Sequence, residues 1–204
     1  MIIYLHGFNS SPESFKAKLI QHRLSDLSRG EEFLCPKLSW RFLSAAAVIG
    51  RTLTELAGEP VCLVGSSLGG FYAVHFAEKY GLAAVLLNPA VTPYKSLANY
   101  LGRQKNLYTG EEYVLELEHM NELLALDVAR ISRPERYLLL AETGDEVLDY
   151  REAVEKFARA KKIIIEGGNH AFSDFSLYVD KVIAFADGHA ATGIMRPGYS
   201  PQLP

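Results

Sequence analysis

A serine lies between two glycines in the segment Gly65-Ser66-Ser67-Leu68-Gly69, directly after the apolar run from Val61 to Val64. A helix is expected to begin near Leu68, so Ser67 would stand on a sharp turn between a strand and a helix. Glycines two residues before and after the serine permit the strained backbone and the close approach of strand and helix that such a turn requires. The spacing predicts Ser67 as a nucleophile, and the alternative is a turn that only reverses the chain.

A serine hydroxyl is a weak nucleophile near neutral pH and needs a base within hydrogen-bonding reach, which is usually a histidine. His170 is the best placed of the six histidines, because it follows the apolar residues 163–165 in a loop at the carboxyl end of a predicted strand. Ligands of α/β sheets gather at that edge. His6 also ends a predicted strand, but it leads into a turn and is assigned a structural role. The other histidines are expected to be packed or solvated: His22, His75, His119 and His189.

The base in turn needs a carboxylate that fixes its tautomer and stabilises the imidazolium. Asp145 follows the run 137–141 and is the favoured candidate. Asp149 is its rival, although its position before the next predicted helix is typical of an N-cap. Glu142 and Glu146 are less favoured alternatives. The resulting order along the chain, Ser then Asp then His, matches the α/β-hydrolase arrangement.

Backbone amides are the expected donors to an oxyanion. The amide of Leu68 stands at the start of its helix, where the helix dipole helps to stabilise negative charge. The second donor should come from the loop after the first strand, with Phe8 as the first choice and Asn9 as the second. The segment 65–70 lacks the lysine of a phosphate-binding loop and the glycine spacing of a dinucleotide site, and no His or Cys pair has metal-ligand spacing. The sequence therefore predicts no cofactor and no metal.

The elements that must position these residues are visible as short apolar runs separated by segments with helical spacing. Continuous hydrophobicity in the runs indicates burial on both faces of a parallel sheet. The pattern predicts an α/β fold with a compact, mostly parallel, doubly wound sheet of about six strands and helices on both faces. Strands are expected at 2–5, 33–35, 61–64, 83–87, 137–141 and 163–165, and helices at 12–27, 43–57, 68–80, 151–160 and 174–187.

The segment 93–135 is too long for a simple connection, and it is predicted to be an inserted cap. Its helical pattern is expected at Val114, Leu117, Met120 and Leu124. A helix covering the sheet edge and one long crossover are the alternatives.

The last residues, 188–204, are rich in Gly and Pro and are predicted to form a tail outside a single domain of residues 1–187. We expect a neighbouring chain to hold this tail, which would make the protein a homo-oligomer.

Composition excludes several classes of function. The chain of 204 residues is 49% hydrophobic, carries a net charge of -3 and has a pI of about 6.1, so it offers no basic surface for nucleic acid. No targeting segment precedes the first strand, and no stretch approaches the roughly 20 apolar residues of a membrane span. We therefore expect a soluble, cytoplasmic protein in which Cys35 and Cys62 are buried thiols.

Four segments occur in an order that resembles α/β-hydrolases, and more narrowly the small bacterial YqiA-like esterases. The resemblance covers roughly residues 1–187 and implies carboxylic esters or thioesters, including acyl-coenzyme A, as substrates. It also implies Ser67, Asp145 and His170 as the catalytic set. The segments are His6-Gly7-Phe8-Asn9-Ser10-Ser11-Pro12, Gly65-Ser66-Ser67-Leu68-Gly69-Gly70, Gly144-Asp145 and Gly168-Asn169-His170.

The sequence thus predicts a serine esterase that hydrolyses a small-molecule ester through an acyl-enzyme. A thioesterase with the same residues is the first alternative, in which Lys95, Arg103 and Lys105 would meet coenzyme A phosphates unless they form a solvated basic face. A catalytically silent binding or regulatory protein with this fold is the second alternative. Five aromatic residues are candidates either for an acyl pocket or for the core: Phe8, Phe71, Tyr94, Tyr100 and Phe172.

Overall fold

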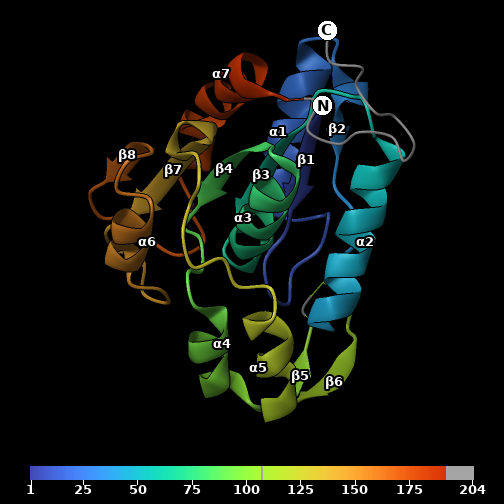
Figure 1. Ribbon diagram of the computed structural model, residues 1–204, viewed down its shortest axis with the longest axis vertical. Coiled ribbons are helices and arrows are strands. Elements are labelled where there is room, and N and C mark those ends of the chain that lie inside the picture. The colour runs from blue at the N-terminus through green and yellow to red at the C-terminus, as the bar shows by residue number, and fades with distance from the viewer. Residues whose placement is uncertain (107, 192–204) are drawn as a thin grey trace, which may run out of the picture.

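The computed structural model describes residues 1–106 and 108–191 of the chain. A six-stranded sheet runs through the molecule in the order β2-β1-β3-β4-β7-β8, and every neighbouring pair of strands is parallel (Figure 1). This arrangement confirms the predicted doubly wound α/β sheet. The strands are β1 (Ile2–Leu5), β2 (Phe33–Leu34), β3 (Cys62–Ser66), β4 (Ala83–Leu87), β7 (Tyr137–Glu142) and β8 (Lys161–Ile165).

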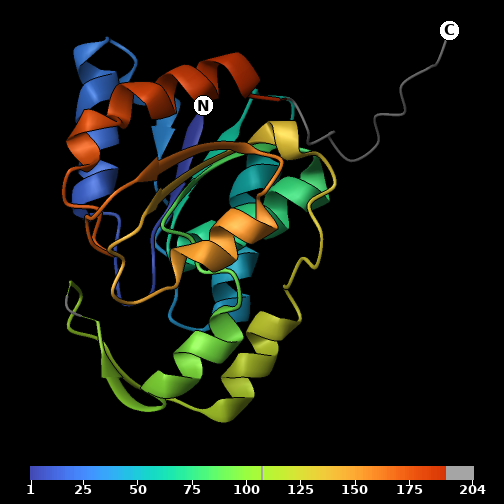
Figure 2. The same cartoon turned by 90° about the vertical axis from the view of Figure 1, so that its left-hand side faces the viewer.

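Helices cover both faces of this sheet, because alternate side chains of each strand enter two separate apolar cores. Ile3 and Leu5 enter one core, and Ile2 and Tyr4 enter the other. The first core is closed by α2 (Phe42–Glu55), α3 (Leu68–Tyr80) and α6 (Tyr150–Lys156), and the second by α1 (Phe15–Asp26) and α7 (Val179–His189). Figure 2 shows α1 and α7 together on one side of the sheet and α2 and α3 on the other.

Helix α1 begins later than the sequence predicted. Ser11 and Pro12 form a turn, in which the Ser11 Oγ accepts a hydrogen bond from the Glu13 amide at 3.0 Å. The helix then starts at Phe15, whose side chain is 53% exposed. The buried residues of the helix are Ala17, Ile20 and Leu24, and Leu19 packs against the same core, whereas Phe15 lies outside it.

Residues 93–136 form a small lobe between β4 and β7, at the carboxyl end of the sheet (Figure 1). Leu117 and Leu124 are 67% and 52% exposed, and Val114 belongs to a strand and is 48% exposed. The predicted helix is therefore present in part, since Leu117, Met120 and Leu124 lie on α5 and Met120 is buried. Val114 was wrongly assigned to it, because the antiparallel pair β5–β6 imposes alternation with period two there. The lobe contains α4 (Pro93–Ser96), η2 (Leu97–Tyr100), β5 (Gly102–Lys105), β6 (Glu112–Leu115), α5 (Leu117–Leu124) and η3 (Pro134–Arg136).

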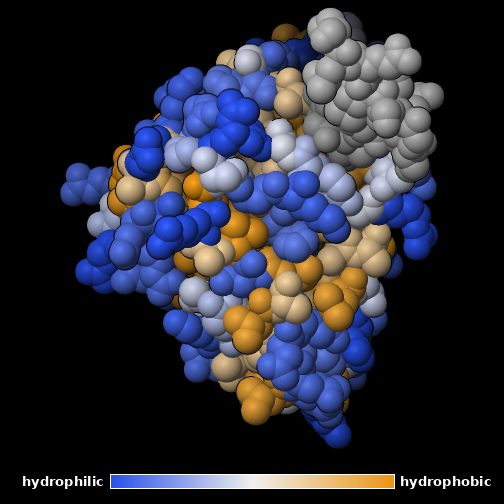
Figure 3. Space-filling model, in the orientation of Figure 1, coloured by the Kyte–Doolittle hydropathy of each residue, from blue (hydrophilic) through white to orange (hydrophobic). Residues whose placement is uncertain are grey.

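Aromatic contacts join this lobe to the main body. Tyr113 on β6 stacks on Trp40 with ring centroids 4.3 Å apart, and it also meets the edge of Phe8 at 6.4 Å. Apolar side chains remain exposed on the lobe between hydrophilic ones, as the lower half of Figure 3 shows. That the lobe acts as a cap stays a prediction.

The C-terminal helix extends past the predicted domain limit at residue 187, since α7 ends at His189. Ala191 then forms an antiparallel bridge with Val61. Residues 192–204 lie outside the described residues, and so does the predicted contact of the tail with a neighbouring chain. Within the part of the chain that is described, no helix has the length and apolar character needed to cross a membrane. Cys35 and Cys62 are free, and burial raises the pKa of both thiols to about 12.

Candidate active site

The predicted serine turn is present between β3 and α3. Ser67 has φ 54° and ψ -120°, a conformation that a residue with a side chain adopts only where the surroundings enforce it. A side-chain carbon on Gly65 would overlap the backbone of Gly69, and one on Gly69 would overlap the carbonyl oxygen of Leu5. The glycines are therefore required by the close packing of α3 against β3 and β1.

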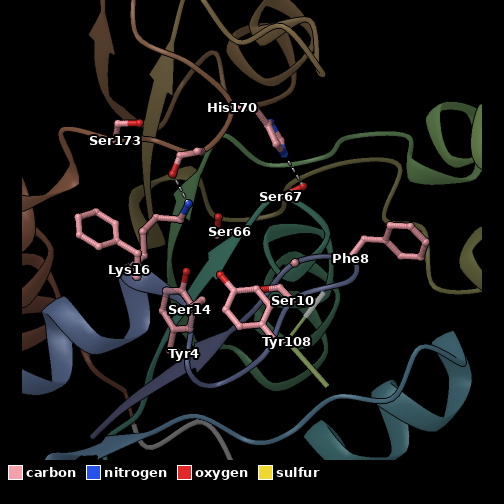
Figure 4. Close-up of a pocket in the computed structure, with 13 residues that line it drawn as sticks. Tyr4, Phe8, Ser10, Ser14, Lys16, Ser66, Ser67, Tyr108, His170 and Ser173 are labelled. Carbon is pink, nitrogen blue, oxygen red and sulfur yellow. Dashed lines mark hydrogen bonds between the residues drawn. The ribbon is translucent and has the colours of Figure 1, made fainter. Parts of the chain in front are cut away.

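The side chains predicted as base and acid lie beside this serine, as Figure 4 shows for His170 and Ser67. The His170 Nε2 is 3.0 Å from the Ser67 Oγ. The His170 Nδ1 is 2.8 Å and 3.0 Å from the two carboxylate oxygens of Asp145. Because a carboxylate only accepts hydrogen bonds, Nδ1 carries the proton toward Asp145 and Nε2 is free to accept one from the serine.

The carboxylate of Asp145 is itself held in place by the backbone. Its Oδ1 accepts hydrogen bonds from the amides of Val147 and Leu148 at 2.9 Å and 2.8 Å. The side chain is 2% exposed, against 20% for His170. Burial and the two amides keep the acid fixed while the imidazole stays open to a substrate.

The rival acids have other partners. Asp149 caps α6 by accepting a hydrogen bond from the Arg151 amide at 3.0 Å, and it also binds the Arg151 guanidinium. Glu146 accepts a hydrogen bond from the His170 amide at 2.9 Å, so it holds the backbone and not the imidazole. Glu142 accepts one from the Asn169 amide at 2.9 Å.

Glu142 is fully buried beneath the loop that carries the histidine. Burial raises the pKa of its carboxyl, and a contact with the Asp174 carboxyl raises it further. Such a pair favours a proton on the glutamic acid, because two close carboxylates cannot both remain charged at low cost. The Glu142 side chain supports the loop from Asn169 to Asp174.

Asn88 was not identified from the sequence, although it follows the strand 83–87 at the same sheet edge as the site. Its side-chain oxygen accepts a hydrogen bond from the Glu142 amide at 2.9 Å, and its amide group donates to the carbonyl oxygens of Asn169 and His170 at 3.1 Å and 3.4 Å. Asn88 therefore joins β4 and β7 to the histidine loop. Its position at a strand end was the signal available in the sequence.

Phe8 and Leu68, whose backbone amides are the predicted oxyanion donors, line the same cavity as Ser67 and His170. Gly7 packs against Ser67, since a side-chain carbon on Gly7 would stand 3.3 Å from the Ser67 Cβ. The amides of Phe8 and Leu68 donate no hydrogen bond within the described residues, so both are available to a ligand. The backbone amide of Asn9 was the second choice for a donor, and the side chain of this residue binds Gln104 and Tyr113.

The remaining histidines serve the fold. The His6 Nε2 accepts a hydrogen bond from the buried Leu38 amide at 3.1 Å, and burial lowers the pKa of the imidazole. The neutral ring of His6 thus ties the first loop to the segment before α2. His75 contacts the Leu126 carbonyl, His189 stacks on Phe185, and His22 is exposed.

Two cavities meet at Ser67 and His170. One of about 530 Å³ has a mainly apolar lining that includes Phe8, Leu97, Tyr100 and Leu148. The other, of about 500 Å³, shares Phe8 with the first and is also lined by Phe15, Tyr108 and Ala171. It contains several hydroxyl groups and an amine: Tyr4, Ser10, Ser14, Lys16, Ser66 and Ser173. Of the aromatic residues considered for an acyl pocket, Phe8 and Tyr100 line the apolar cavity, whereas Phe71 and Phe172 are buried in the two cores and Tyr94 packs against one of them.

A group of possible metal ligands lies away from this site, in the lobe. Glu116, Glu118 and His119 bring their ligand atoms within 4.8 Å of one another. The His119 Nδ1 accepts a hydrogen bond from the Glu116 amide at 2.9 Å, so this group caps the start of α5. The cap accounts for Glu116 and the His119 Nδ1, whereas the His119 Nε2 is buried without a hydrogen-bond partner among the described residues.

Comparison with known protein families shows to which family the chain belongs. A family model described as an uncharacterised protein family, UPF0227, matches residues 1–187. The chain belongs to the UPF0227 family. A UPF0227 protein of Yersinia pseudotuberculosis serotype O:1b is 24% identical over 189 residues, which cover 91% of this chain and 98% of the relative.

Solved structures show the same fold as this UPF0227 protein at low sequence identity. Alpha/beta hydrolase domain-containing protein 10 from mouse superposes with a TM-score of 0.66 at 18% identity, over 90% of this chain and 89% of the mouse chain. Est1E from Butyrivibrio proteoclasticus, solved with ferulic acid bound, gives a TM-score of 0.67 at 16% identity, over 92% and 88% of the two chains. The chain thus has the α/β-hydrolase fold, and the resemblance predicted from its motifs is confirmed.

Proposed function

We propose that this UPF0227 protein is a serine esterase that hydrolyses carboxylic esters through an acyl-enzyme on Ser67. The observation that carries the proposal is the continuous hydrogen-bonded chain from the Ser67 Oγ through His170 to Asp145, with distances of 3.0 Å and 2.8 Å. Hydrogen bonds of this length allow proton transfer during attack by the hydroxyl. Est1E, an esterase with the same fold, gives the proposal further support.

In the proposed reaction, the Ser67 Oγ attacks the ester carbonyl carbon while its proton passes to the His170 Nε2. The negative charge that develops on the carbonyl oxygen is stabilised by the amides of Phe8 and Leu68. The carbon–oxygen bond to the alcohol then breaks, and the alcohol leaves with the proton from Nε2. Water, deprotonated by His170, attacks the acyl-enzyme and releases the carboxylic acid.

Asp145 acts through the imidazole in this scheme. Its carboxylate keeps the proton on Nδ1 and stabilises the positive charge of the imidazolium formed during each transfer. All steps use side chains and backbone amides of this chain, so the mechanism requires no metal or organic cofactor.

A thioester substrate remains the alternative for the same residues. Lys95, Arg103 and Lys105, the cations that the thioesterase alternative would use for coenzyme A phosphates, do not line the two cavities at Ser67. Lys105 pairs with Glu112 at 3.3 Å, Lys95 faces a separate surface hollow, and Arg103 is exposed. A comparison of an acyl-coenzyme A with an oxyester of equal acyl length measures this preference directly.

Replacement of the nucleophile is the first test. Ser67→Ala is expected to lower kcat for a chromogenic short-chain ester by about a millionfold, because attack by the hydroxyl has no substitute. Ser44→Ala is the matched control, since Ser44 is exposed on α2, and it should keep wild-type turnover. Full activity in folded Ser67→Ala protein would show that another group is the nucleophile.

Covalent labelling separates an enzyme from a silent binding protein of this fold. An organophosphonate should modify Ser67 in the wild-type protein, with a mass increase confined to the peptide that contains it, and should leave Ser67→Ala unmodified. A folded wild-type protein without any label would favour the silent alternative.

A further inference from the structure

The hydroxyl-rich cavity beside Ser67 differs in chemistry from the apolar cavity that it meets at the same serine. Figure 4 shows Lys16, Ser14, Tyr4 and Ser10 gathered on one side of Ser67, with the Phe8 ring on the other. A substrate bound across Ser67 would therefore place one part against apolar side chains and the other against hydroxyl groups and an amine.

Lys16 brings an amine into this cavity. Burial lowers its pKa to about 8, and the charges of Glu142 and Asp145 act in the opposite direction, so the group is mostly protonated near pH 7. Its side chain is half-buried, and its Nζ donates a hydrogen bond to the Ala171 carbonyl at 2.5 Å (Figure 4). None of the ion pairs among residues 1–106 and 108–191 includes Lys16. The nearby carboxyl groups are occupied, because Asp145 binds His170 and Glu142 contacts Asp174 and the Asn169 amide. Two donors of the ammonium group thus remain for a ligand.

Ser14 provides a second, independent sign of a missing partner. Its side chain is 8% exposed, and its Oγ is buried beside the Tyr4 hydroxyl without a hydrogen bond of normal geometry among the described residues. It precedes α1 but makes no capping bond to that helix, and the first turn of α1 contains no acidic residue. Buried hydroxyl groups are normally satisfied, so an unpaired one at a cavity indicates a polar ligand. The positive end of the α1 dipole favours a ligand with negative charge.

We propose that this cavity binds an anionic group, a carboxylate or a phosphate, on the alcohol part of the ester, and that Lys16 and Ser14 select it. This inference rests on the proposed esterase function and names the substrate class of that site. The apolar cavity takes the acyl chain, because its lining offers dispersion contacts and few charged groups. The leaving alcohol then occupies the hydroxyl-rich side, with its anion at the ammonium of Lys16.

Matched esters with one acyl group test the proposal. The probes are the butyrate esters of 4-hydroxybenzoate, which carries a carboxylate, of 4-hydroxyphenyl phosphate, and of the neutral 4-hydroxybenzamide. The measured quantity is the ratio of kcat/KM for each anionic ester to that for the amide. This ratio does not depend on the fraction of folded protein, so a variant that folds poorly still reports on selectivity.

The wild-type protein is expected to favour at least one anionic ester, and Lys16→Met should lower that ratio about tenfold or more, as for the loss of a hydrogen-bonded charge partner. Lys16→Arg should restore most of the preference. Ser14→Ala should lower the ratio by a smaller factor. The matched control is Lys18→Met on the outer face of the same helix, where the ammonium pairs with Glu13 at 2.8 Å, and this variant should leave the ratio unchanged.

A wild-type protein that hydrolyses all three esters equally would overturn the anion site while leaving the esterase function intact. Equal losses on the neutral and anionic esters in Lys16→Met would also overturn it, because they would assign Lys16 to the fold. Absence of hydrolysis for every ester, together with absence of organophosphonate labelling, would instead contradict the esterase function itself.

Discussion

Carboxyl groups in and after β7 illustrate how surroundings decide the role of a residue. Asp145 contacts the imidazole of His170, whereas Glu146 accepts a hydrogen bond from the amide of the same residue. Asp149 caps a helix, and Glu142 is buried below the histidine loop. All of them are acids of similar strength in water, so only their contacts distinguish them.

Replacement of Asp145 or Asp149 by asparagine should separate the role of the catalytic acid from that of the helix cap. Asp145→Asn is expected to lower kcat about 10⁴-fold, because an amide no longer stabilises the imidazolium or the required tautomer. Asp149→Asn should change kcat less than about threefold, because asparagine is an equally good helix N-cap. The kcat of each purified variant for ester hydrolysis shows which of the two acids acts with His170. A larger loss from Asp149→Asn would contradict the assignment of the acid.

The raised pKa of Glu142 predicts a pH-dependent stability. A carboxyl whose pKa is higher in the folded state than its usual 4.5 stabilises the fold fully below that value, and this contribution is lost as the pH rises through the folded pKa. Glu142→Gln resembles the protonated acid at every pH. The free energy of unfolding of the variant should therefore rise relative to wild type as the pH increases above 4.5, with a slope of at most about 1.4 kcal/mol per pH unit.

Urea denaturation at several pH values measures this difference. The wild-type protein serves as the reference at each pH, so that other titrating groups cancel. A constant difference between the two proteins across the range would show that Glu142 ionises as an ordinary surface carboxylate does.

At the scale of elements, the turn between β3 and α3 depends on contacts that leave no room for side chains. The helix lies so close to β1 that Gly69 faces the Leu5 carbonyl, and Gly65 faces the start of the same helix. The resulting geometry holds Ser67 at φ 54° and keeps the Leu68 amide at the helix start open to a ligand. Strain at Ser67 is thus maintained by packing on both sides of it.

Gly69→Ala tests this packing. The added methyl group would overlap the Leu5 carbonyl oxygen, so the variant should lose about 3 kcal/mol or more in free energy of unfolding, as overpacked sites do. Gly50→Ala is the matched control inside α2, because its methyl group would meet Phe76 at an ordinary 3.6 Å. Alanine there should add about 0.5–1 kcal/mol from its higher helix propensity. Denaturant titration of both variants measures the contrast, and equal stabilities would contradict the close approach of α3 and β1.

At the scale of the whole molecule, the order of strands brings the site together. Ser67 and His170 are 103 residues apart in the chain. Since β3, β4, β7 and β8 are neighbours and parallel, the loops at their carboxyl ends meet along one edge. Asn88, after β4, fills the position between the serine turn and the loop of the acid. The lobe 93–136 leaves the sheet at this same edge and supplies part of the apolar cavity.

Most of the fold could be predicted because its signals are local. Each strand of the main sheet is a short apolar run, and α3 was predicted at its observed limits of 68 and 80. The pair β5–β6 was missed because its strands contain charged and polar residues in a short, alternating pattern, such as Gly102–Lys105. The late start of α1 was missed because Ser11 and Pro12 also suit a turn.

The sequence by itself determined the reactive side chains that are available, their order along the chain and the class of fold, because motif spacing and hydrophobic periodicity are properties of neighbouring residues. Tertiary structure decided which carboxylate meets the imidazole, which amides stay unpaired, and that Lys16 reaches Ala171, 155 residues away. These features depend on contacts between distant segments, which form only when the sheet is assembled.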